Sequence, residues 1–81
     1  MEIARVVSEL VCTRRVPGLS HCGLRVVRTA QGMVSVATDA VGAPVGRWVF
    51  TTTGTAARLA MPDRATVTDL TICGIIDRWD E

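Results

Sequence analysis

The sequence predicts an all-β protein, a small five-stranded, OB-like β-barrel with one short helix. Three observations support this. Val, Ile and Thr dominate the apolar stretches, and these residues favour extended backbone. The stretches are short and bounded by Gly or Pro. The 81 residues are too few for more than one domain, so we treat residues 1–81 as one unit. A β-sandwich of the same size is the alternative.

The first strand is predicted over residues 3–13, where apolar side chains recur at alternate positions. One face would carry Ala4, Val6, Leu10 and Cys12, with Ser8 as an interruption. The other face also holds valines, so we expect both faces to be at least partly covered. Residues 14–23 contain Pro17 and two glycines, which predicts a loop.

A hairpin is predicted next, from strands over residues 24–28 and 34–38. The connection between them is tight and offers Gly32 for a backbone position with positive φ. Residues 39–46 contain two glycines and a proline, so they are expected to form another loop.

The second half of the chain holds two more strands and the helix. A fourth strand over residues 47–53 should end at Gly54, and residues 55–60 are Ala-rich and prone to form a short helix. Either Thr53 or Thr55 could cap that helix. The last elements are a strand over residues 70–76 and an acidic tail over residues 77–81.

The composition points to a protein that contacts other chains. Hydrophobic residues make up 48% of the sequence, a large share for so small a domain, so some apolar surface should face another subunit. All nine basic residues are Arg, which suits fixed ion pairs at interfaces, although a GC-rich genome would produce the same bias. The net charge of +1 gives no strong reason to expect nucleic acid or a membrane as partner. No stretch resembles a signal peptide or a membrane span, so we expect a cytosolic protein.

The residues capable of chemistry do not form a known catalytic pattern. Cys12, Cys22 and Cys73 are odd in number and lack C-x-x-C spacing, which favours reduced thiols over disulfides or a zinc site. His21 stands beside Cys22, and a small enzyme using this pair is one rival interpretation; an exposed loop histidine is the simpler one. Aspartates at strand ends are expected to cap turns. We therefore expect no catalysis, no cofactor and no metal.

A second rival is a module that binds single-stranded nucleic acid. OB-like barrels of that class combine a basic groove with stacking aromatic rings. Trp48 and Phe50 fall on one face of a predicted strand and could form such a platform. The nearly balanced charge favours a core or subunit-contact role for these two rings instead.

Three segments together resemble one protein family. They are residues 4–15, residues 39–58 with the run Gly-Thr-Ala-Ala-Arg at 54–58, and residues 69–79 with the ending Ile-Cys-Gly-Ile-Ile-Asp-Arg-Trp. In this order and spacing they are similar to the EutN/CcmL family of bacterial microcompartment vertex proteins. The run Thr-Arg-Arg-Val-Pro-Gly-Leu at 13–19 and the Ile-Ile-Asp-Arg-Trp ending look most like the α-carboxysome branch.

The resemblance implies a structural role and an oligomer. Members of this family are five-stranded barrels that assemble as ring-shaped pentamers, which cap the five-fold vertices of a shell whose facets are tiled by hexameric shell proteins. The chain would then be a single vertex domain over residues 1–81, a homopentamer, and a part of the carboxysome shell in the cytoplasm. A cyclic ring uses a head-to-tail interface, so each subunit needs two different complementary surfaces.

The resemblance also suggests which residues serve the ring. The pore lining near the five-fold axis would be Gly54, Thr55 and Ala56. The subunit interface would include Arg58, Asp77, Arg78 and Trp79. The simpler alternatives are a helical turn that closes one barrel mouth, an Arg58 in solvent, and a Trp79 that covers its own barrel. An interface role for Trp79 is favoured because a Trp on an acidic tail should have little local core to join.

Overall fold

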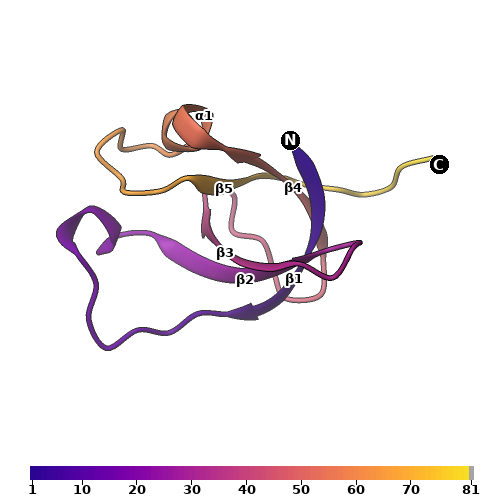
Figure 1. The fold of residues 1–81 in the computed structure, drawn as a ribbon, viewed down its shortest axis with the longest axis horizontal. Coiled ribbons are helices and arrows are strands. Elements are labelled where there is room, and N and C mark those ends of the chain that lie inside the picture. Colours follow the sequence, from indigo (N-terminus) through magenta and orange to yellow (C-terminus); the bar gives the residue numbers. More distant parts are fainter. Residues whose placement is uncertain (81) are drawn as a thin grey trace.

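The computed structural model describes residues 1–80 and shows a closed barrel of five strands with one helix (Figure 1). Its elements, in chain order, are β1 (Glu2–Glu9), the 3-10 turn η1 (Pro17–Leu19), β2 (Gly23–Thr29), β3 (Val34–Asp39), β4 (Trp48–Thr53), α1 (Gly54–Ala60) and β5 (Leu70–Ile75). The predicted barrel and its short helix are thus confirmed. None of the helices in the described part of the chain is long and apolar enough to cross a membrane.

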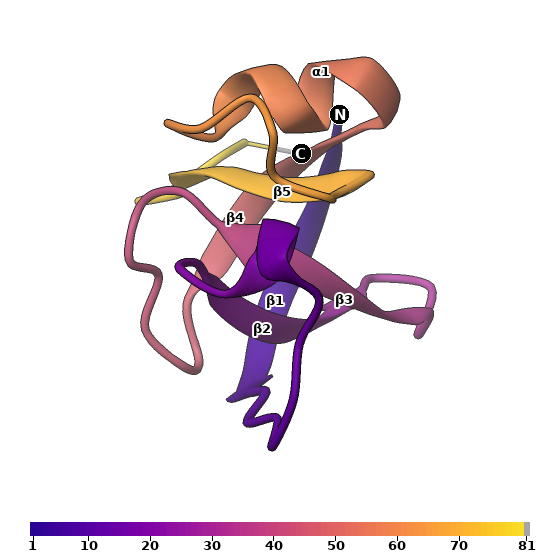
Figure 2. The same ribbon diagram turned by 90° about the vertical axis from the view of Figure 1, so that its left-hand side faces the viewer.

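The barrel closes in the order β1-β2-β3-β5-β4, with β4 paired back to β1. Four of its pairings are antiparallel, including the predicted β2–β3 hairpin, whose Gly32 has φ +89° as expected. The pairing of β3 with β5 is parallel and short, with Thr38 opposite Thr71 and Asp39 opposite Ile72. α1 lies across β5 and β4 at one end of the barrel (Figure 2).

The first strand is shorter than predicted and ends at Glu9 instead of residue 13. A strand needs a neighbour to bond its backbone, and β2 begins only at Gly23, so among the described residues 1–80 the chain beyond Leu10 has no strand partner to continue with. A bulge between Val6 and Ser8 shifts the register, and Ser8 lies exposed. The bulge is the physical reason for the interruption in the predicted alternation.

The barrel interior is filled by small side chains. The buried cluster consists of Ala4, Val6, Val27, Ala37, Ala43, Val49 and Ile72, with Leu70 and Ile75 partly buried against it. Three of the seven buried members are alanines, so the core is thin and each larger side chain in it matters. A thin core is typical of a domain of 81 residues.

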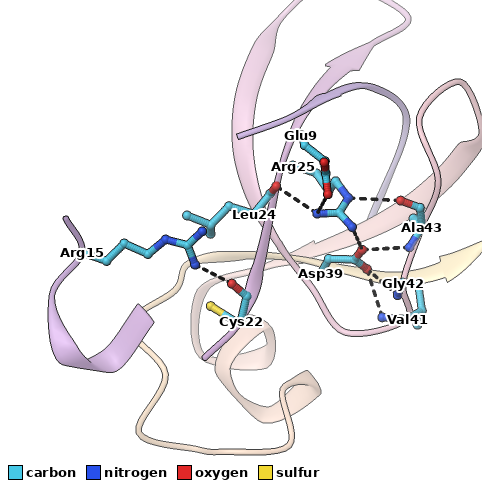
Figure 3. Close-up of polar contacts among 9 residues, drawn as sticks. All are labelled: Glu9, Arg15, Cys22, Leu24, Arg25, Asp39, Val41, Gly42 and Ala43. Carbon is cyan, nitrogen blue, oxygen red and sulfur yellow. Dashed lines mark hydrogen bonds and ion pairs between the residues drawn. The ribbon is translucent and has the colours of Figure 1, made fainter. Parts of the chain in front are cut away.

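A buried carboxylate organises the loop after β3 (Figure 3). Oδ1 of Asp39 accepts hydrogen bonds from the amides of Val41 and Gly42 at 3.0 and 2.9 Å. Its Oδ2 accepts one from the Ala43 amide at 2.8 Å and lies 3.4 Å from Nη2 of Arg25. The Asp39 side chain is only 1% exposed. It caps this turn, as predicted for an aspartate at a strand end.

Candidate subunit-contact and pore-lining surfaces

The first turn of α1 is set by backbone geometry at Gly54. Its φ is +65°, a region that disfavours any residue with a Cβ, while no atom lies within 4 Å of where that Cβ would be. The conformation, and not lack of space, therefore requires glycine. Thr53 occupies the N-cap position, but its side chain forms no capping hydrogen bond, and Thr55 lies inside the helix. The expected threonine cap is absent; the Gly54 amide instead donates to the Asp69 carbonyl at 3.0 Å.

The other end of α1 is held by a buried threonine that the sequence did not single out. Oγ1 of Thr71, on β5, donates to the Ala57 carbonyl at 2.8 Å and lies 2.8 Å from Oγ1 of Thr38 on β3. Thr71 is fully buried. Because a threonine in a strand is ordinary, only the tertiary contact reveals that this one attaches the helix to the barrel.

The residues proposed to line a pore lie together on the exposed side of α1. Gly54, Thr55 and Ala56 are exposed, while Ala57 on the same helix is completely buried against the barrel. Arg58 is exposed too, and it borders a shallow depression that it shares with Asp69. The first turn of α1 is thus an exposed surface with small side chains, and the buried Ala57 packs the helix against the barrel.

The remaining proposed contact residues extend away from the opposite end of the barrel (Figure 1). Asp77 and Arg78 are exposed, and Asp77 forms a surface ion pair with Arg47 at 3.4 Å. The Trp79 ring packs edge-on against Trp48, with centroids 5.5 Å apart, and stays 41% exposed. Trp79 was expected to have little local core to join, and the structure gives it one aromatic neighbour, Trp48 of β4. The described contacts do not bring Arg58 to this segment.

The two aromatic residues of β4 are partly covered from within the chain. Trp48 is half-buried under Trp79 and has the Arg5 guanidinium 6.0 Å from its ring centroid. A side chain at Gly74 would collide with the Phe50 ring, so that ring lies directly over the neighbouring strand. Both rings are half-buried, so they offer less aromatic surface for stacking bases than a fully exposed pair would.

The His21–Cys22 pair lies in the loop before β2. His21 is exposed, and Sγ of Cys22 donates to the Leu19 carbonyl at 3.4 Å. Both border a shallow hollow of about 280 Å³. Within residues 1–80, no cluster of three or more His, Cys, Asp or Glu side chains is placed to hold a metal ion.

Large apolar side chains are exposed over much of the surface. Val11 is 87% exposed, and Met33, Leu59 and Val67 are each more than half exposed. Exposed apolar area of this extent is typical of surfaces that contact other protein chains. The predicted surplus of apolar surface is therefore present in the structure.

Comparison with known proteins agrees with this geometry. A protein from Halothiobacillus neapolitanus named carboxysome shell vertex protein CsoS4B is 56% identical over 79 residues, covering 98% of both chains. The solved structure of CsoS4B from that organism superimposes with a TM-score of 0.91 at 55% identity, covering 96% of this chain and all of that one. A structure described as the pentameric shell protein MSM0273 from the RMM microcompartment gives a TM-score of 0.90 at 29% identity, covering 100% of this chain and 96% of that one.

The match to the family itself extends over almost the entire chain. The family model described as "Ethanolamine utilisation protein EutN/carboxysome" matches residues 1–77, from the start of the barrel to the first residues after β5. The barrel, its short helix and the exposed apolar surface are what such a subunit requires. The chain belongs to the EutN/CcmL family.

Proposed function

We propose that the chain is a structural subunit of the carboxysome shell and that five copies form a ring that caps a five-fold vertex. The observation that carries this proposal is the identity of 54–56%, over 88–98% of this chain, to relatives named carboxysome shell vertex protein. The shape similarity to a pentameric shell protein supports the ring. The role is geometric: the ring supplies curvature and closes a corner, and it needs no catalytic group.

The experiment that tests this function measures mass in solution. Native mass spectrometry of the purified chain at micromolar concentration should give five times the 8.7 kDa chain mass. A monomer under these conditions would contradict the ring. In the shell, hexameric shell proteins are the neighbours that surround each pentamer, and co-assembly with them should yield closed particles only when this chain is present.

The two groups of proposed contact residues suit a head-to-tail ring. Arg58 lies on the α1 side of the barrel, whereas Asp77, Arg78 and Trp79 lie beyond the end of β5. A five-fold ring brings two different surfaces of each subunit together. The α1 side of one subunit and the C-terminal side of the next are the surfaces that we assign to the interface.

The pore assignment can be tested by cross-linking. If Gly54, Thr55 and Ala56 surround the five-fold axis, a Thr55→Cys variant should react across that axis with a short bismaleimide and give covalently linked subunits. The exposed Cys12 would be replaced by Ser in the background. A Ser8→Cys variant, on the barrel wall, is the control that should stay unlinked. Equal linking in both variants would count against the assignment.

A further inference from the structure

Two arginines face each other on the outer wall of the barrel without a carboxylate to balance them. Arg5 on β1 stands directly opposite Arg28 on β2 in the antiparallel register. Like charges at directly opposed positions destabilise a sheet. Within residues 1–80, the ion pairs involve other arginines, and none reaches Arg5 or Arg28. The isolated subunit thus carries an unfavourable pair of charges on this wall.

These arginines line a hollow that has the character of a contact surface. It has a volume of about 420 Å³, and its apolar lining includes Val45 and Trp48. Nε of Arg5 donates to the Gly46 carbonyl at 3.1 Å, which fixes that guanidinium in place. We call the surface formed by Arg5, Arg28, Val45 and Trp48 the basic wall. It continues into Trp79, which packs on Trp48.

A second hollow carries the opposite charge. It borders the start of α1, has a volume of about 570 Å³, and is lined by Glu2, Thr53, Gly54 and Asp69 among others. The described residues that line it include two carboxylates and no basic side chain. Both carboxylate residues are exposed, and neither takes part in an ion pair within residues 1–80. We call this surface the acidic mouth.

We propose that the acidic mouth of one subunit docks against the basic wall of the next copy, pairing Asp69 and Glu2 with Arg28 and Arg5. The proposal rests on the proposed ring and specifies its interface. The two hollows adjoin, because Thr29 lines both. Two different surfaces on each copy give a head-to-tail contact, and such a contact forms a ring when the rotation from one copy to the next closes after five copies.

The partner that docks is a second copy of this chain, because the chain carries both the basic wall and the acidic mouth. The charges are complementary, and the wall is continuous with the C-terminal side while the mouth borders Gly54 at the start of α1. Charge complementarity of this kind determines which partner docks and in which register, and juxtaposed like charges are strongly disfavoured. The cross-strand repulsion between Arg5 and Arg28 would be relieved only in the ring.

Charge reversal tests the pairing. Arg28→Glu and Asp69→Arg, each alone, should raise the concentration at which pentamers form at least ~10-fold, because each places like charges in contact. The combined Arg28→Glu/Asp69→Arg variant restores opposite charges and should return within about threefold of the unaltered chain. Arg64→Glu, an exposed reversal outside both hollows, is the control and should have no such effect. Native mass spectrometry over a dilution series measures all four.

A variant with a neutral side chain, Arg28→Gln, tests the same pairing without a reversed charge that could impair folding. Added salt should weaken assembly of the unaltered chain, because salt screens exposed ion pairs, and should weaken assembly of Arg28→Gln less. Pentamers unaffected by both single reversals, or a combined variant no better than the singles, would overturn the inference while leaving the ring intact. A gel-mobility shift of single-stranded DNA that depends on Arg28, with pentamers unchanged, would also overturn the inference, in favour of a surface that binds nucleic acid. A monomeric unaltered chain would instead contradict the proposed function.

Discussion

Replacing Thr71 by valine removes one buried hydroxyl and keeps the shape of the side chain. That hydroxyl donates to the Ala57 carbonyl at 2.8 Å. The carbonyl belongs to the last turn of α1, where the Met61 amide donates to the Arg58 carbonyl at 3.2 Å. Thr38, the other neighbour, can turn to the Leu70 carbonyl at 3.2 Å. The variant therefore takes the side-chain donor away from one buried acceptor.

The expected loss of stability in Thr71→Val follows from that one carbonyl acceptor. An unsatisfied buried polar group costs about 1–3 kcal/mol, and the added methyl group occupies the space of the hydroxyl, so no cavity forms. A loss of ~2 kcal/mol corresponds to a fall in Tm on the order of 10 °C for a domain of this size. The effect should be local as well: amide exchange in α1 should accelerate more than exchange in β1 or β2.

The control is the same change on the neighbouring strand. Thr52 lies directly opposite Thr71 in the β4–β5 pairing and is 8% exposed, but its hydroxyl forms no hydrogen bond within residues 1–80. Thermal and urea unfolding of Thr71→Val and Thr52→Val, at one fixed protein concentration because assembly adds stability, gives the comparison. If Thr71→Val lowers the free energy of unfolding no more than Thr52→Val does, the Thr71 hydroxyl does not anchor the helix.

Two further predictions concern the loop after β3 and the C-terminal tail. Asp39→Asn should lower the free energy of unfolding by roughly 3 kcal/mol, because it removes a buried partner of Arg25 and turns an amino group toward loop amides. Asp77→Asn, at a 95% exposed side chain, is the control and should change the free energy of unfolding by at most ~0.5 kcal/mol. Urea unfolding that ranks the two variants the other way would refute the role of the buried carboxylate. Trp79→Ala should reduce the pentamer fraction in native mass spectrometry more than it unfolds the barrel, while Trp79→Phe keeps a ring on Trp48 and should retain it. A fully pentameric Trp79→Ala variant would show that this ring does not anchor the interface.

Local residue patterns were enough to place most elements along the chain. β-branched stretches marked all five strands to within a few residues, because side chains that crowd the backbone favour extended structure wherever they occur. Gly32 marked a turn that needs positive φ, since that requirement belongs to the residue itself, whereas the positive φ of Gly42, Gly46 and Gly54 was seen only in the structure. The resemblance of residues 54–58 and 69–79 to one family then supplied the ring and its role, which no local pattern contains.

Residue patterns along the chain were therefore sufficient for the strand content and the family, whereas the contacts between distant side chains came from the fold. Barrel closure brought Thr71 under Ala57, Trp48 beside Trp79 and Arg5 opposite Arg28. Such partners are far apart along the chain, and their register depends on a bulge in β1 and on the short parallel pairing of β3 with β5. A one-residue slip would turn each of these side chains to the other face, so no local pattern could specify these contacts.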